Sequence, residues 1–354
     1  MNGAERRAAP KPARVPSADR PAYSPDEGFT AMGYHFRAHR GAYGAALMFV
    51  LIFALYIAKH PVGWTVPVLT TATNKGVLLA IAAMAQTLPV LTSGIDLSVG
   101  MVFVLANCLA SHLVVGSPLQ AAFGVVVVLA VGALCGLING LIIVVGRLQP
   151  IITTLATGTV YFGLALGLRP VPGGQVHAAM ADAITGAPLA GVPSMLLVLI
   201  VVVLLVWVPY RRSAIGRAAL AIGSAEGAAY MSGVPIGRAK IVTYTLAGLL
   251  AAIGGLLLTF VTYSGEASSA IGGTYTLNSI VAVVIGGTSL AGGAGSAIGS
   301  VFGALVLRTI GDLLFVFDFE PLWQPLFQGV ILLVAVSLGA LQLLKVSNRL
   351  ELFR

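Results

Sequence analysis

The sequence predicts an all-α, polytopic membrane protein with about ten transmembrane helices. Of its 354 residues, 58% are hydrophobic and only 9% are charged, whereas a soluble domain carries roughly 25% charged residues. Apolar runs of about 20 residues, the length that crosses a bilayer core, recur along the chain. Basic residues also gather between alternate runs. Together, these three observations predict that most of the chain lies in lipid.

The chain divides into a tail, a membrane domain and a short second tail. Residues 1–40 are rich in Pro, Ala and Arg and contain no long apolar run, which predicts a disordered cytoplasmic tail. A secretory signal is not expected, because the first apolar run begins near Ala42 and continues into a full-length span. The membrane domain covers 41–345, and residues 346–354 form a cytoplasmic C-terminal tail. The predicted spans are 42–58, 76–93, 98–115, 120–145, 151–168, 193–209, 240–263, 275–290, 296–316 and 323–343. The run 76–115 fits either two helices or one helix followed by a broken one.

The distribution of basic residues predicts the orientation. With ten spans and a cytoplasmic N-terminus, the segments on the cytoplasmic side (the inside segments) and the adjoining helix ends hold 16 of the 20 Lys and Arg residues. This bias favours a multi-pass protein of the bacterial inner (plasma) membrane with both termini in the cytoplasm. It also accounts for the net charge of +8 without any nucleic-acid partner.

Two predicted spans carry glycines at every fourth position, which is typical of closely packed membrane helices. The helix-packing glycines are Gly132, Gly136 and Gly140 in the fourth span, and Gly295, Gly299 and Gly303 in the ninth. The two ladders lie five helices apart and run in opposite directions. They therefore suggest two inverted five-helix repeats, an arrangement found in many transporters.

The sequence lacks the patterns of an enzyme or a metalloprotein. Cys108 and Cys135 lie in apolar runs, and the five histidines show no ligand spacing, so we expect neither a metal site nor a cofactor. No phosphate-binding Gly-x-x-x-x-Gly-Lys-Ser/Thr loop occurs, and neither does a His-Glu-x-x-His pair or a Gly-x-Ser-x-Gly elbow.

Asp96 is the acidic residue that stands out. It lies in the stretch 93–100, Ser-Gly-Ile-Asp-Leu-Ser-Val-Gly, between two apolar runs. A carboxylate at membrane depth is costly and usually functional, and glycines on both sides suit an unwound segment that lines a transport site. A plain cytoplasmic turn in which Asp96 or Ser98 caps the next helix fits the spacing equally well.

Other polar residues in the spans allow both structural and functional interpretations. Asn139, in an apolar helix, either bonds a neighbouring helix or faces a polar pathway, and the structural role is favoured. Gln149, Thr153 and Thr154 flank Pro150 at a helix start, where capping is the simplest role. Arg308 and Asp312 are spaced four apart and are expected to pair on one helix face.

The segment 210–240 is the longest predicted inside loop after the N-terminal tail. Ser224 is placed to cap a helix, Glu226 suits its first turn, and Gly233 followed by Pro235 suits its end. The pattern predicts one short helix near 225–232 outside the membrane. This helix is either an ordinary connector or a docking helix for a cytoplasmic partner.

Several blocks of the sequence resemble one family of transport proteins. The stretch 93–100 resembles the "GGIDLSVG" signature of ribose-type ABC permeases, and Asn139-Gly140 with 148–155 resembles the family's "NG…QPFIATL" segment. The run 221–233 is similar to its cytoplasmic loop, and 280–293 is nearly its "IAAVVIGGTSLAGG" block. The resemblance covers roughly residues 45–343, with the blocks in the family's order.

This resemblance implies a translocation subunit that is not itself an enzyme. Two such permeases, identical or a related pair, would form the pathway for a sugar or related small molecule. A cytoplasmic ABC ATPase would dock on the inner loops, and a periplasmic sugar-binding protein would deliver the cargo. Implied residues of the substrate pathway or gate are Asp96, Ser98, Asn139, Gln149, Thr153, Thr154 and Asn278. Implied residues of the ATPase coupling loop are Arg217, Ser224, Glu226, Tyr230, Gly233 and Arg238.

The sequence departs from the family pattern at three places. The family commonly has an acidic residue at the position of Asn278 and Asn at the position of Ala225, and 309–312 replaces an "NNG"-like stretch. These departures suggest that this chain is one half of an unequal permease pair. Two alternatives remain at this point. One is a secondary transporter with Asp96 as proton carrier, and the other is an ABC permease for branched-chain amino acids, although its "GQxSLG" block is missing.

Overall fold

A computed structural model of the chain describes residues 31–320 and part of 323–337, with side chains described from residue 40 onward. The chain forms two units, Met1–Ala38 and His39–Arg354, and the account below concerns the larger unit. The described residues form helices and connecting loops, with no strand beyond two isolated bridges. In chain order the helices are α1 (Ala31–Lys59), α2 (Val66–Leu91), α3 (Val99–Leu113), α4 (Pro118–Val145), α5 (Pro150–Leu168), α6 (Ala178–Thr185), α7 (Ser194–Val202), the π-helix η1 (Val203–Trp207), α8 (Val208–Arg212), α9 (Ala214–Ser224), α10 (Glu226–Met231), α11 (Ile236–Thr262), α12 (Ser269–Ile285) and α13 (Ala297–Val316).

The all-α membrane fold predicted from composition is confirmed. Within the described part of the chain, seven helical runs are long and apolar enough to cross a membrane, and α7, η1 and α8 together make one of them. The shorter helices α3 and α12 match two further predicted spans. The tenth predicted span, 323–343, lies largely outside the described residues. The count of about ten and the inverted repeat stay predictions.

Local sequence signals explain where several helices begin. Pro118 and Pro150 occupy the first positions of α4 and α5, where a missing amide hydrogen costs nothing. Ser117 and Gln120 form a reciprocal capping box at the start of α4. Ser296 caps α13 through a bond from Ile298 N. These signals define the starts more sharply than the apolar runs do.

Some predicted boundaries need correction. Helix α1 begins at Ala31, inside the predicted tail, and α2 begins at Val66, ten residues before the predicted span. Helix α12 covers 269–285 instead of 275–290, because the loop that follows has glycines with left-handed backbone, among them Gly287 and Gly292. Gly295 lies in this loop, with φ of 147°, so its assignment to a helical ladder is wrong.

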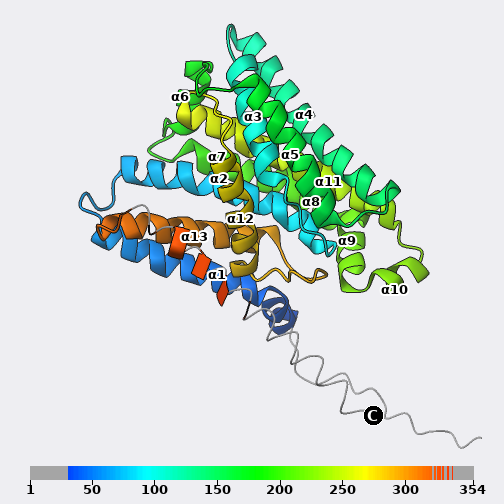
Figure 1. Cartoon of the computed structure of the whole chain (residues 1–354). Helices are drawn as coiled ribbons and strands as arrows, with labels where there is room; N and C mark the ends of the chain where they lie inside the picture. Colours follow the sequence, from blue (N-terminus) through cyan, green and yellow to red (C-terminus); the bar gives the residue numbers. More distant parts are fainter. Residues whose placement is uncertain are drawn as a thin grey trace, which may run out of the picture. The chain divides into compact units, whose positions relative to one another are not determined.

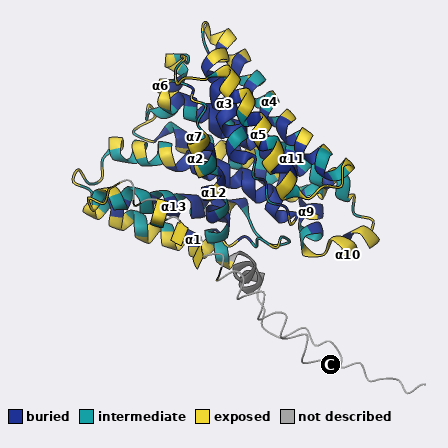
Figure 2. Cartoon of the chain, in the orientation of Figure 1, coloured by how far each residue is buried: buried dark blue, intermediate teal, exposed yellow. Residues whose placement is uncertain are grey.

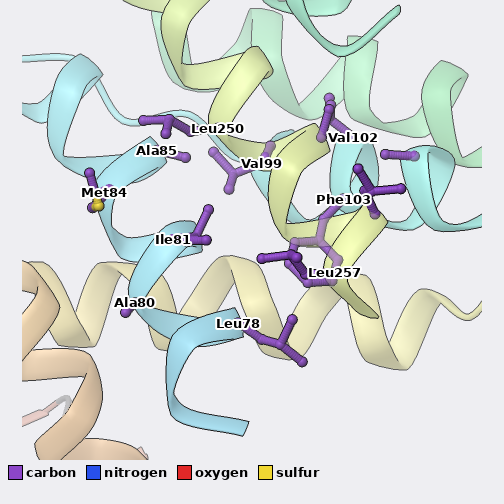
Figure 3. Close-up of a cluster of buried hydrophobic side chains, with 14 of the residues drawn as sticks. Leu78, Ala80, Ile81, Met84, Ala85, Val99, Val102, Phe103, Leu250 and Leu257 are labelled. Atoms are coloured by element: carbon purple, nitrogen blue, oxygen red, sulfur yellow. The ribbon is translucent and has the colours of Figure 1, made fainter. Parts of the chain in front are cut away.

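The core forms where α2, α3 and α11 meet. Figure 3 shows Ile81 and Met84 from α2, Phe103 from α3 and Leu257 from α11 in one cluster of buried side chains. Helix α11 packs along α4, α3 and α2, while α12 and α13 also pack against α2 (Figure 1). Figure 2 shows that burial is concentrated in these central helices, whereas α4 and α5 carry exposed apolar side chains on their outer faces. Such faces are expected to contact lipid or another membrane protein.

The glycine ladder of α4 is a close-packing face, as predicted, and its partner is α11. A Cβ atom added at Gly136 would lie 2.1 Å from Tyr244 O, and one at Gly132 would lie 2.2 Å from Ala252 Cβ. On α13, an added Cβ at Gly303 would lie 2.1 Å from Ala282 O of α12. Only glycine permits these backbones to approach so closely.

Hydrogen bonds between loops define two ends of the unit. At the end that we name the α10 end, the loops 92–98, 223–235 and 286–296 meet. At the opposite end, named the α6 end, the region 169–186 contacts Ser111, Asn74 and the segment 263–265. The predicted inside loops 94–97, 210–239 and 291–295 therefore share one end, which is what the predicted topology requires.

Candidate functional site

The chain between α2 and α3 is unwound. Helix α2 ends at Leu91, Ser93 adopts φ of 61°, and α3 begins at Val99. Pro89 O accepts hydrogen bonds from the amides of Thr92 and Gly94, which closes the end of α2. The run 76–115 thus forms two helices joined by the short stretch 92–98, one of the two arrangements that the sequence allowed.

The Asp96 side chain is buried in this segment and only 2% exposed. Its Oδ1 accepts hydrogen bonds from Ser98 N over 2.8 Å and from Ser98 Oγ over 2.6 Å. None of the ion pairs among the described residues involves Asp96. A buried carboxylate that is held by hydrogen-bond donors, without a cation, is costly and marks a candidate functional site.

A network of hydrogen bonds extends from Asp96 across three helices. Asn139 Nδ2 of α4 donates to Ser98 Oγ over 2.8 Å. Tyr161 Oη of α5 donates to Asn139 Oδ1 and lies equally close, 3.0 Å, to Cys135 O. The predicted residues Asp96, Ser98 and Asn139 are therefore brought together. Asn139 has the interhelical role that was favoured for it.

Capping and site-forming roles coincide at Asp96. Its carboxylate bonds the amide of Ser98 at the start of α3, as a capping residue would. The Ser98 side chain makes no cap bond to α3. Thr154 also belongs to this cluster, because its hydroxyl accepts from Leu97 N over 2.9 Å. Thr153 is buried, and its hydroxyl has no hydrogen-bond partner among the described residues.

Two predicted pathway residues lie apart from this cluster. Gln149 is exposed at the N-cap of α5 and makes no side-chain cap bond. Asn278, on α12, lines a separate cavity together with Lys75 and Arg308. The structure therefore gives neither residue a contact with the Asp96 network.

Sequence reasoning missed several members of the site. Gln86 of α2 is fully buried; with its amide oriented to satisfy both atoms, it donates to Asp96 O over 2.8 Å and accepts from Asp96 N over 3.2 Å. A glutamine within the apolar run of α2 was the available signal.

Tyr244 of α11 is also fully buried, and its hydroxyl has no hydrogen-bond partner in the described part of the chain. A Cβ added at Gly94 would lie 2.4 Å from that hydroxyl oxygen, so a glycine at this position is needed to accommodate the Tyr244 side chain.

Helix α3 is held between α5 and α12. Gly100 N donates to Thr276 Oγ1 of α12 over 3.0 Å. A Cβ added at Gly158 of α5 would lie 3.6 Å from Met101 Cγ. A Cβ added at Gly272 of α12 would lie 2.7 Å from Met101 Sδ. The partly buried Met101 side chain thus sits between glycines of two helices, near the start of α3.

The predicted helix near 225–232 is confirmed as α10, Glu226–Met231. Glu226 lies in its first turn and pairs with Lys240 over 2.8 Å, and Gly233 follows its end with φ of 77°. The capping role predicted for Ser224 is wrong, because Ser224 is the last residue of an unpredicted helix, α9, and bonds back to Leu220 O. Ala225 occupies the N-cap position instead.

The exposed face of α10 is apolar. Tyr230 is 71% exposed and Met231 is 85% exposed, while Ala229 is buried against α9 and α11. Of the basic residues predicted here, Arg238 is exposed, and Arg217 is exposed but donates to Arg212 O over 2.7 Å. Exposed apolar side chains at the end of a basic loop are suited to contact another protein.

The loop that carries α10 touches the unwound segment. Ser93 Oγ lies 3.2 Å from Gly223 O and 2.7 Å from Ala291 O. Gly293 N donates to Leu91 O over 3.2 Å. Backbone packing is tight as well, since an added Cβ at Gly223 would lie 2.1 Å from Leu91 O. A displacement of the α9–α10 loop, residues 214–235, would therefore also displace the stretch 92–98, which holds Asp96.

Arg308 and Asp312 form the predicted pair, with Arg308 Nη2 2.8 Å from Asp312 Oδ1. Lys75 of α2 adds a longer contact of 3.8 Å to the same carboxylate oxygen. The Lys75 contact joins α13 to α2 near the α6 end, and all three residues lie outside the Asp96 network.

Comparisons with known proteins identify relatives along most of the chain. Residues 68–336 match the family model described as the permease component of the branched-chain amino acid transport system. The ribose import permease of Bacillus subtilis is 35% identical over 259 residues, which cover 72% of this chain and 79% of that protein. The fructose import permease of Rhizobium meliloti is 33% identical over 282 residues, 76% of this chain and 77% of that protein. A probable ABC transporter permease of Sinorhizobium fredii is 35% identical over 272 residues, 75% of this chain and 78% of that protein. No solved structure matches the chain.

Proposed function

Since this chain belongs to the ABC import permease family, among its ribose-type sugar permeases, we propose that it forms the transmembrane pathway of an ATP-driven sugar importer. A permease is a translocation subunit, so the chemistry of ATP hydrolysis is left to a partner. The cargo is a monosaccharide or related small molecule, because relatives that match most of the chain are ribose and fructose import permeases.

The contact between the α9–α10 loop and the unwound segment carries the mechanistic part of the proposal. Tyr230 and Met231 present an exposed apolar surface to a cytoplasmic ABC ATPase. Movement of this ATPase pushes or pulls the loop, and the bond between Ser93 and Gly223 passes the displacement to the stretch 92–98. The Asp96 network then rearranges between α3, α4 and α5, which opens or closes the pathway at the α10 end. Such rearrangements are typical of unwound segments in transporters.

The remaining partners follow from the same scheme. The α10 end faces the cytoplasm and the α6 end faces the periplasm of a bacterial inner membrane, because the predicted inside segments hold most basic residues. Both termini are then cytoplasmic. A periplasmic sugar-binding protein delivers the cargo at the α6 end, and a second permease, identical or related, completes the pathway.

Two other functions fit the observations less well. A proton-driven transporter would use Asp96, which is buried without a cation. It would leave the exposed α10 without a role and does not suit a chain from this family. Branched-chain amino acid import agrees with the description of the family model, yet the ribose and fructose relatives named above import sugars.

The test is ATPase activity that depends on a sugar. The permease is reconstituted in lipid with the ATPase and the binding protein encoded beside it, and a panel of pentoses, hexoses and branched-chain amino acids is added. Stimulation by one sugar supports the proposal and names the cargo. Stimulation by an amino acid alone would move the chain to the alternative cargo, and uptake that depends on a proton gradient without any ATPase would overturn the proposal.

Whether one permease suffices is tested separately. The departures at Asn278, Ala225 and 309–312 suggest an unequal pair. Co-expression of this permease and the ATPase, with no second permease gene, should then give no transport-competent complex. A stable and active complex from these two chains would establish a homodimer.

A further inference from the structure

A cavity of about 510 Å³ lies between α2, α12 and α13, apart from the Asp96 network, and Pro325 and Gly329 after α13 also line it. Its polar lining comes from Lys75, Thr274, Tyr275, Asn278 and Arg308. It lies toward the α6 end, because Asn74, next to Lys75, donates to Thr185 O of α6 over 2.8 Å. A cavity of this volume is within the range of small-molecule sites.

The charge of this cavity is unbalanced. The described residues that line it include two cations, Lys75 and Arg308, and no carboxylate. Asp312 lies behind the wall and contacts both cations, Arg308 Nη2 at 2.8 Å and Lys75 Nζ at 3.8 Å. One carboxylate neutralises only one of the two charges, so a net positive charge remains at the cavity. Lys75 is 47% exposed, while Arg308 and Asp312 are more buried, so the excess positive charge lies where an anion can reach it from solvent.

The hydrogen-bonding capacity of Arg308 is also incomplete. Its Nε–H is buried and has no partner among the described residues, although an unsatisfied buried donor is unfavourable. Asn278 and Thr274 add neutral polar groups to the same wall. A guanidinium, an ammonium and neighbouring neutral polar groups form the kind of set that recognises a carboxylate or a phosphate.

We propose that this cavity binds a small organic anion through its carboxylate or phosphate, held between Lys75 and Arg308. The anionic group supplies the negative charge that Asp312 alone does not, and Asn278 orients the adjoining polar part of the ligand. Two sources share this chemistry, a soluble sugar acid or sugar phosphate and the headgroup of an anionic phospholipid. The inference does not rest on the transport cycle.

The test measures binding to the purified full-length chain in an uncharged maltoside detergent at constant ionic strength. The probes are glucuronate, glucose 6-phosphate and short-chain phosphatidylglycerol, with glucose as the neutral control, and the readouts are calorimetric affinity and the thermal unfolding midpoint. The variant Lys75→Gln removes the unbalanced charge from a half-exposed position, so folding should survive. The matched control is Lys59→Gln, which changes a lysine at the end of α1 that does not line the cavity.

The expected result is that at least one anionic probe binds and raises the unfolding midpoint, while glucose does neither. Lys75→Gln should weaken that binding by about tenfold or more, as loss of one charge-assisted contact would, and Lys59→Gln should leave it unchanged. Binding of the sugar anions identifies a soluble ligand, and binding of phosphatidylglycerol alone identifies a lipid. No preference for the anionic probes over glucose, or equal weakening by both lysine variants, would overturn the proposal.

Discussion

At the scale of single residues, the site is defined by buried polar groups whose partners come from other helices. Asp96 accepts two bonds from Ser98, and Asn139 and Tyr161 extend the network to α4 and α5. The sequence alone predicted Asp96, Ser98 and Asn139 because polar residues in apolar runs are conspicuous. It did not predict Tyr161 or Tyr244, because a tyrosine in a membrane helix is common and nothing in the sequence tells which partner its hydroxyl meets.

The variant Asp96→Asn tests the role of the buried charge. The amide oxygen of the substituted side chain would still accept the bond from Ser98 N, so folding and assembly should survive. If the charge helps to switch the segment 92–98, sugar transport in the reconstituted complex should fall at least about tenfold, which corresponds to roughly 1.4 kcal/mol. Glu266→Gln, which changes an exposed acid at the α6 end, is the control and should transport normally. Normal transport by Asp96→Asn would leave Asp96 with the capping role alone.

Two buried tyrosines provide a matched test of the network. Tyr161→Phe removes a hydroxyl that bonds Asn139, so it should lower the free energy of unfolding by about 1 kcal/mol. Tyr244→Phe removes a hydroxyl that has no partner among the described residues, so stability should be unchanged or slightly higher. Thermal unfolding of both variants in detergent checks the difference. If transport by Tyr244→Phe falls while its stability holds, the hydroxyl finds its partner in another state of the transport cycle. If Tyr244→Phe lowered stability as much as Tyr161→Phe, the Tyr244 hydroxyl would not be unpartnered in the folded protein.

At the scale of helices, close backbone contacts decide which helices are neighbours. The glycine spacing of α4 predicted a packing face, but its partner, α11, follows about 90 residues later in the chain and could not be read from local pattern. The apolar runs also misplaced the starts of α1 and α2, because both helices begin in mixed polar sequence before the apolar stretch. Helix α9 was missed because the loop 210–240 was read as holding a single helix.

Gly136→Ala should separate α4 from α11. The new methyl group would lie 2.1 Å from Tyr244 O, so the helices must move apart, at an expected cost of about 1–3 kcal/mol of stability. Gly163→Ala on α5 is the matched control, because no atom lies within 4 Å of its added Cβ. This control should be neutral or stabilising by up to about 1 kcal/mol, since Ala favours helix. Unfolding midpoints measured in one detergent compare the pair, and equal midpoints would show that the α4–α11 contact is not tight.

The exposed face of α10 is tested by a double substitution. Tyr230→Ala with Met231→Ala removes two exposed side chains, so the permease itself should stay as stable as before. Co-purification with the ATPase should weaken and sugar-stimulated ATPase activity should drop by at least about tenfold, because exposed aromatic and methionine side chains often anchor interfaces. Leu119→Ala, which changes an exposed residue at the start of α4, should affect neither measurement. Intact coupling in the double variant would exclude this face as the docking surface.

At the scale of the whole molecule, the composition and the order of apolar runs were sufficient to predict a polytopic helical protein. The charge bias further predicted which loops share an end, and the hydrogen bonds of Ser93 bring three of these loops together. The cavity at Lys75 and Arg308 could not be predicted from the sequence, because α2, α12 and α13 line it and their contacts depend on the tertiary fold.

Labelling from outside the cell tests the orientation. Leu189 lies in the exposed connection at the α6 end, and Ser232 lies just after α10. The native Cys108 and Cys135 are buried and should react slowly. A membrane-impermeant maleimide should therefore label Leu189→Cys in cells with a permeabilised outer membrane, and Ser232→Cys only after the inner membrane is disrupted. The reverse pattern would invert the proposed topology.

The bond between Asn107 and Thr259 has a consequence for biosynthesis. Asn107 of α3 donates to Thr259 Oγ1 of α11 over 2.9 Å, and the two residues are 152 positions apart. At a synthesis rate of about 5–20 residues per second, roughly 8–30 s pass between their emergence from the ribosome. Throughout that interval a 15-residue helix that carries a polar amide lacks its native partner. Because lipid cannot satisfy an amide group, α3 is poorly suited to the bilayer on its own until α11 has been made.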